Sequence, residues 1–112
     1  MTTPFTLNLA SGAVSFPLSV SEAQRLQTAL YEFVQSLKTI AAQVGQGEKP
    51  SPQPDLNYQS VGEVLLEIFC NPNIYPNPHS AKVLITVRDE KIRISVDAEL
   101  PRLLEDLNTL LN

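Results

Sequence analysis

The sequence predicts an α+β fold in which two antiparallel β-hairpins form one four-stranded sheet, with helices packed on one face. Three observations predict this fold. Apolar and polar residues alternate over 5–18 and again over 83–96, which is the period of half-buried strands. A stripe of apolar residues with helical spacing follows each alternating stretch. Strands that are apolar on one side require a single covered sheet face.

The 112 residues are expected to form one domain, 1–112, because a chain of this length buries enough surface to fold without a metal or a disulfide. The expected order of elements is ββα-α-ββα. A shift of 78 residues places Phe5 on Val83 and Leu18 on Val96, so the two hairpins align without a gap. This alignment suggests a two-fold internal repeat, although two short-looped hairpins would also align without common descent.

The first hairpin is expected to turn at Ser11-Gly12, because glycine accepts the positive φ of a two-residue turn. Every pair across the strands is then apolar, which makes the register self-consistent. The expected pairs are Leu9/Val14, Leu7/Phe16 and Phe5/Leu18.

A long helix is expected over 20–44. Ser19 and Glu22 have the spacing of a capping box, and Gly45 is a residue typical of a left-handed helix end. The helix would be about 37 Å long, whereas a strand of five or six residues spans about 20 Å. Its distal apolar residues are therefore expected to extend beyond the sheet and to contact a partner. The candidate interaction surface consists of Leu37, Ile40 and Val44.

Two segments connect this helix to the second hairpin. The stretch 45–59 is rich in proline and glycine and is expected to be a mobile loop. In the stretch 60–70, Ser60 and Glu63 have capping-box spacing and the apolar residues after them recur with helical spacing, which favours a short helix. A strand is the alternative there, because the run is short and rich in β-branched residues.

The loop 71–80 contains three prolines and three asparagines, so it is expected to be irregular and stiff. Amide, phenol and imidazole groups on a stiff backbone are typical of a pocket mouth. A proline-stiffened connection explains the same residues without any ligand. The candidate ligand loop consists of Asn73, Tyr75, Asn77 and His79.

The second hairpin is expected to turn near Asp89-Glu90, and a last helix is expected to begin near Asp97 or Leu100. The polar face of the second hairpin is basic, which suggests weak nucleic-acid binding as an alternative function. The net charge of −4 and the lack of interleaved aromatic residues argue against that alternative. The expected basic face consists of Lys82, Thr86, Arg88, Lys91, Arg93 and Ser95.

No catalytic or metal-binding motif is recognisable. Cys70 and His79 are the only cysteine and histidine, too few for a zinc site made of these two residue types. Glu63 and Glu67 would lie one helical turn apart, an arrangement that is more often solvated than catalytic. No nucleophile motif and no phosphate-binding glycine loop occurs. We therefore expect neither enzymatic activity nor a cofactor.

The sequence contains no secretory signal and no apolar run of membrane-spanning length, so we expect a cytoplasmic protein without a membrane segment. The composition is acidic, with a pI near 4.8. The expected function is a non-enzymatic protein-interaction module, such as an adaptor, scaffold or assembly factor, that forms a homodimer. A small-molecule binding module is the alternative that uses the loop 71–80.

Overall fold

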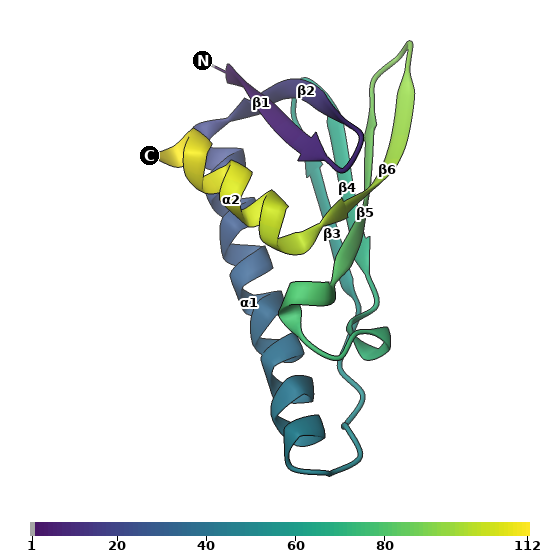
Figure 1. Cartoon of the computed structure of the whole chain (residues 1–112). Helices are drawn as coiled ribbons and strands as arrows, with labels where there is room; N and C mark the ends of the chain where they lie inside the picture. Colours follow the sequence, from purple (N-terminus) through teal and green to yellow (C-terminus); the bar gives the residue numbers. More distant parts are fainter. Residues whose placement is uncertain (1) are drawn as a thin grey trace.

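The computed structural model describes residues 2–112, with side chains from Pro4 onward. Two antiparallel sheets and two helices confirm the α+β class (Figure 1). The strands are β1 (Thr2–Leu9), β2 (Gly12–Ser19), β3 (Leu56–Val61), β4 (Leu65–Cys70), β5 (Lys82–Arg88) and β6 (Arg93–Glu99). The helices are α1 (Val20–Gly45) and α2 (Leu100–Leu111), with single 3₁₀ turns at η1 (Pro72–Ile74) and η2 (Pro78–Ser80).

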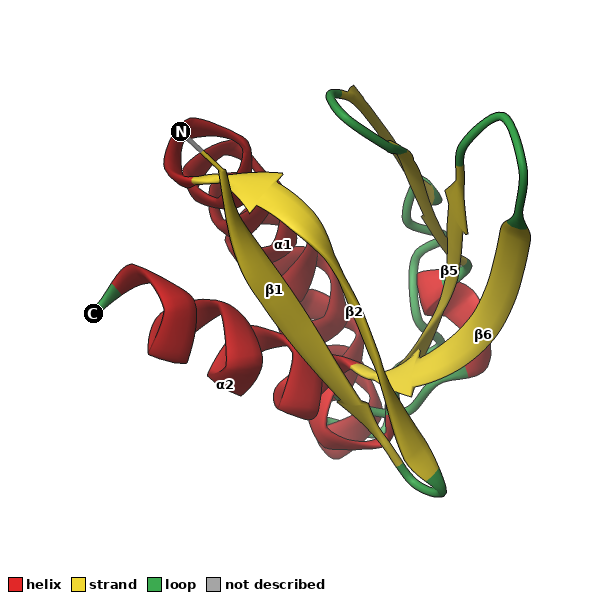
Figure 2. Cartoon of the chain, turned by 90° about the horizontal axis from the view of Figure 1, so that it is seen from above, coloured by secondary structure: helices red, strands yellow, loops and turns green. Residues whose placement is uncertain are grey.

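The four-stranded sheet has the order β3-β4-β5-β6, and all its neighbours are antiparallel. It is therefore built differently from the expected sheet, because β1 and β2 pair only with each other. In Figure 2 the two helices and the β1–β2 hairpin all lie on one side of the four-stranded sheet. This layer buries the core, and the opposite face of the sheet carries no helix.

The prediction of a helix over 60–70 was wrong, because this segment contains the end of β3, the turn and the whole of β4. Leu66, Ile68 and Cys70 point into the core with a period of two. The residues between them include the apolar Phe69, which points outward. In a strand with apolar residues on both faces, apolar residues recur at spacings of three and four as well as two. Spacings of three and four are also those of a helix, so the pattern was misleading.

The registers of the two predicted hairpins each differ by two residues from the expected pairs. In the first, Leu7 pairs with Val14 and Phe5 with Phe16, so the turn is Ala10-Ser11. The rings of Phe5 and Phe16 meet edge to face, with centroids 5.4 Å apart. In the second hairpin β5 and β6 are joined by the four residues 89–92. A shift of two leaves every side chain on its expected face, so the alternation alone does not fix the register.

The start and length of α1 agree with the sequence prediction. Ser19 Oγ accepts a hydrogen bond from the Glu22 N–H at 3.1 Å, and the Glu22 side chain accepts one from the Ser19 N–H, which completes the capping box. Gly45 is the last helical residue and does not form the expected left-handed end. The left-handed residue is Gly47, with φ of 74°.

The expected overhang of α1 was wrong for two of its three residues. Leu37 is 0% exposed and Ile40 is 3% exposed, so both belong to the core of this chain. The turns η1 and η2 lie along the second half of α1 and supply the cover that the sheet does not reach (Figure 1). Only Val44 is exposed. The buried residues cannot serve as a free interaction surface.

The segment between α1 and β3 is held by side-chain hydrogen bonds. The Ser51 N–H donates to the Gln43 side chain at 2.8 Å. The Asn73 side chain accepts from the Gln53 N–H at 2.7 Å and donates to the Gln53 carbonyl at 2.9 Å. The mobility expected for this loop stays a prediction, as does the internal repeat. Neither helix is long and apolar enough to span a membrane, within residues 2–112.

Candidate functional site

The face of the four-stranded sheet that points away from the helices carries no helix or further strand within residues 2–112 (Figure 2). We call it the open sheet face. Its residues follow from the strand registers, which place every second side chain on this side. The open sheet face consists of Asn57, Gln59, Val61, Leu65, Glu67, Phe69, Lys82, Leu84, Thr86, Arg88, Arg93, Ser95, Asp97 and Glu99.

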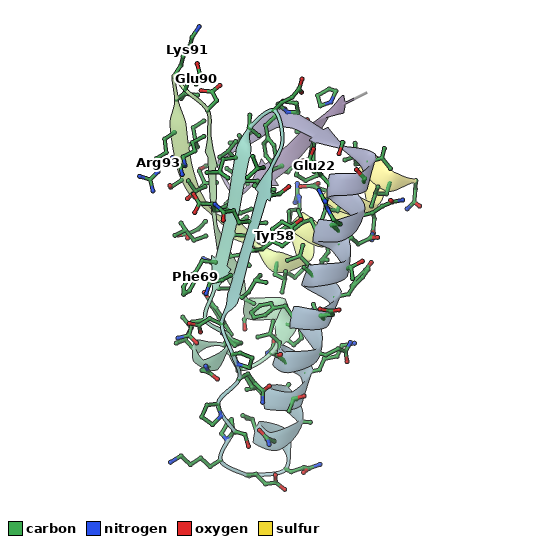
Figure 3. All side chains as sticks on the ribbon, turned by 180° about the vertical axis from the view of Figure 1, so that it is seen from behind. Glu22, Tyr58, Phe69, Glu90, Lys91 and Arg93 are labelled. Atoms are coloured by element: carbon green, nitrogen blue, oxygen red, sulfur yellow. The ribbon has the colours of Figure 1, made fainter. Side chains whose placement is uncertain are left out.

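An apolar pair lies within this face. Phe69 on β4 is directly opposite Leu84 on β5, and the two side chains are 41% and 43% exposed. Figure 3 shows Phe69 on the side of the sheet that is remote from α1. Both side chains line a hollow of about 310 Å³. The polar side chains of Asn57, Gln59 and Thr86 line the same hollow. Glu67 lines it as well. Phe69 and Leu84 lie in one row across the strands, and Gln59, Glu67 and Thr86 lie in the next, so the hollow has an apolar side and a polar side.

The charges of the open sheet face are distributed unevenly along the strands. Arg88 and Arg93 are directly opposite each other at the end next to the β5–β6 turn. Like charges in this position repel, and Glu67 offsets part of the charge with its Oε1 3.5 Å from Arg88 Nε. Asp97 and Glu99 lie toward the other end of β6, where Lys82 is directly opposite Glu99. The face therefore has one end with net positive charge and one end with net negative charge.

The basic residues of the second hairpin do not form one continuous stripe. Lys82 lies at the far end of β5, where its cross-strand partner is Glu99. Lys91 lies in the β5–β6 turn next to Glu90, and Figure 3 shows both side chains at the tip of this hairpin. A continuous basic track along phosphates would require these lysines to lie beside the arginines without carboxylates between them. This arrangement gives no support to the nucleic-acid alternative.

A polar cluster joins the start of α1 to β3, and Figure 3 labels two of its members, Glu22 and Tyr58. The Ser60 hydroxyl, in a residue only 6% exposed, donates to Glu22 Oε2 at 3.2 Å. Burial raises the pKa of Tyr58, and the nearby Arg25 opposes this shift. The cluster ties the capped helix end to the sheet. Sequence reasoning found Glu22 as a cap but missed its bond to Ser60, because the two residues are 38 positions apart.

The four residues of the predicted ligand loop do not converge on one pocket. Asn73 bonds the backbone of Gln53, and Asn77 caps the η2 turn by accepting from the Ser80 N–H at 3.1 Å. Tyr75 packs partly buried against the core. These three side chains stabilise the loop and its neighbours.

Two members of that predicted set line cavities, and the cavities are separate. Asn73 lines a hollow of about 330 Å³ together with Ile40, Lys49, Pro50 and Pro52. His79 lines a second cavity. The cavity has a volume of about 210 Å³ and lies between α1, η2 and the start of α2. We call it the His79 cavity. It is lined by Val34, Lys38, Pro78, His79, Leu100, Pro101 and Leu104.

Cys70 is a buried free thiol, and its burial raises its pKa to about 11. Its Sγ lies 3.2 Å from the Lys82 carbonyl, to which the thiol donates. A thiol with so high a pKa is a poor nucleophile near neutral pH. Nowhere in residues 2–112 do three or more potential metal ligands form a group.

Fold and site together define an antiparallel α+β protein with one helix-covered and one open sheet face. No family model matches the chain, and neither a curated protein nor a solved structure is similar to it.

Proposed function

We propose that this protein is a non-enzymatic protein-interaction module that forms a homodimer through its open sheet face. The observation that carries the proposal is the Phe69–Leu84 pair, two large apolar side chains side by side on a face that no helix covers. Contiguous exposed apolar surface marks interaction sites more often than isolated apolar residues do. Such a module would serve as an adaptor, scaffold or assembly factor.

The size of the open sheet face is compatible with a small dimer interface. Four strands spaced about 4.8 Å apart, with about six residues each at 3.3 Å, cover a projected area of about 400 Å². Side-chain relief increases the accessible area by roughly half, so two copies would bury about 1,200 Å² in total. This is the lower end of the range for specific interfaces, and we expect a dimer that dissociates on dilution.

The charge pattern favours one orientation of the second copy. Two facing sheets in a symmetric dimer are related by a two-fold axis that lies between them. An axis parallel to the strands would place the basic end of one copy over the basic end of the other. An axis across the strands, over the row that contains Glu67 and Ser95, brings Arg93 to Asp97 of the second copy. It also brings Leu65 to Phe69 and Leu84 to Arg88 of the second copy. Glu67 then lies over its own equivalent, and the intrachain pair with Arg88 offsets part of this repulsion.

Light scattering coupled to size exclusion, over a range of concentrations, tests the proposal. Leu84→Lys should abolish the dimer, because it places an ammonium group beside Phe69 and, in the orientation above, opposite Arg88 of the second copy. Ile74→Lys is the matched control, because Ile74 is 67% exposed on η1 and lies off this face. A monomeric wild-type protein at all concentrations, or a dimer that survives Leu84→Lys, would overturn the proposal.

A charge exchange tests the orientation separately. Arg93→Asp and Asp97→Arg should each weaken the dimer by about fivefold or less, as expected for a partly exposed ion pair. The double variant should restore the wild-type dissociation constant. Additive losses in the double variant would reject the orientation while leaving the open sheet face as the contact.

We also propose a cytoplasmic location. The support is indirect: the single cysteine cannot form an intramolecular disulfide, and a protein without disulfides suits a reducing compartment.

A further inference from the structure

The His79 cavity lies on the helix side of the sheet and is independent of the open sheet face. Three elements that are distant in sequence form it, with Val34 and Lys38 from α1, His79 from η2, and Leu104 from α2. Val34 and Lys38 are four residues apart and so lie on the same face of α1. Tertiary packing alone brings these side chains together.

The chemistry of the lining is divided between an apolar wall and two nitrogen groups. Val34, Leu104 and the two prolines supply aliphatic surface. Lys38 contributes an ammonium group that has no carboxylate oxygen within 4 Å among residues 2–112. The imidazole of His79 makes no hydrogen bond within that part of the chain. Both groups are exposed and free to bind a ligand.

We propose that the His79 cavity binds a short aliphatic or aromatic monocarboxylate. The apolar part of such a ligand would pack against Val34 and Leu104, and its carboxylate would accept hydrogen bonds from Lys38 and His79. Charge selects the sign of the ligand, because the lining contains a lysine and no acidic residue. The volume of about 210 Å³ selects a short ligand, since pockets for drug-sized molecules begin near ~300 Å³.

Titration of the full chain with hexanoate, followed by NMR, tests the proposal. A ligand this small should bind with a dissociation constant on the order of 1 mM. It should shift the methyl resonances of Val34 and Leu104 before those elsewhere. The uncharged 1-hexanol is the comparison ligand, and it should bind at least fivefold more weakly because it lacks the carboxylate.

Variants separate the roles of charge and shape. Lys38→Met should remove the preference for hexanoate over 1-hexanol, whereas Lys49→Met, a change at another exposed lysine outside this cavity, should leave it intact. Leu104→Trp should block both ligands by filling the cavity. Circular dichroism checks that each variant is folded.

Three outcomes would overturn the assignment. In the first, 1-hexanol binds as tightly as hexanoate, which would leave a non-selective apolar hollow. In the second, Lys38→Met leaves hexanoate binding unchanged. In the third, hexanoate produces no saturable shift in the wild-type protein. None of these outcomes affects the dimer test, because Leu84 and Phe69 lie on the opposite side of the sheet.

Discussion

Truncation of Leu37 to alanine is the sharpest test of where the long helix is buried. Leu37 is 0% exposed, so Leu37→Ala removes three buried carbon atoms. At about 0.8 kcal/mol for each buried methylene-sized group the transfer contribution is roughly 2.4 kcal/mol, and the cavity left behind raises the total to about 3 kcal/mol. Val44→Ala is the matched control on the same stripe. Val44 is 47% exposed, and we expect its truncation to cost well under 1 kcal/mol.

Urea unfolding monitored by circular dichroism measures both values. With a denaturant slope of about 1.5 kcal/mol/M, the Leu37→Ala midpoint should fall by about 2 M, and the Val44→Ala midpoint by less than about 0.5 M. All samples need the same protein concentration, because a dimer makes apparent stability depend on concentration.

One result would refute the assignment of Leu37 to the core. If Leu37→Ala cost as little as Val44→Ala but lowered the mass in light scattering, the side chain would lie in a contact between copies. A loss of about 3 kcal/mol with an unchanged dissociation constant is the result that the buried position predicts.

Two further predictions concern the polar cluster and the buried thiol. A Cβ at Gly62 would lie 2.6 Å from Glu22 Oε2, so Gly62→Ala should displace this carboxylate and lower the unfolding free energy by about 1–2 kcal/mol. A Cβ at Gly45 would have no heavy atom within 4 Å, so Gly45→Ala should be neutral or slightly stabilising. Equal changes in the melting temperature of the two variants would contradict the close approach of Gly62 to Glu22. Burial raises the pKa of Cys70 from 9.0 to about 11 in the folded state. The protonated buried thiol therefore contributes fully to stability below pH 9, and this contribution is lost between pH 9 and 11. The Cys70→Ala variant should therefore lose less stability than the wild-type protein between pH 9 and 11. If the urea midpoints of the two proteins changed by the same amount from pH 8 to 11, the prediction would be rejected.

Local sequence patterns were sufficient where they extend over many residues or involve neighbours. The capping box at Ser19 and Glu22 spans three positions, and it places the start of α1 correctly. The alternation over 5–18 and 83–96 likewise identifies both hairpins and the side of each strand that is buried. These patterns depend on hydrogen bonds and periodicities that the chain carries within one element.

The candidate sites were less accessible to sequence reasoning. Of the predicted ligand-loop residues, Asn73 and His79 line two separate cavities, and the partners of His79 that are distant in sequence come from α1 and α2. Of the predicted interaction surface only Val44 is exposed. The Phe69–Leu84 pair was missed altogether, because 65–70 was expected to be helical and its outward side was not considered.

The sequence by itself therefore determined the fold class, the position of the long helix, and the two hairpins with alternating strands. The tertiary structure decided which strands share a sheet, because pairing between β4 and β5 joins segments on either side of a proline-rich loop. It also decided that Leu37 is covered, because the residues of η1 and η2 that lie along α1 are more than 30 positions away in the chain. Contacts between distant segments depend on how whole elements pack, and no local periodicity records that packing.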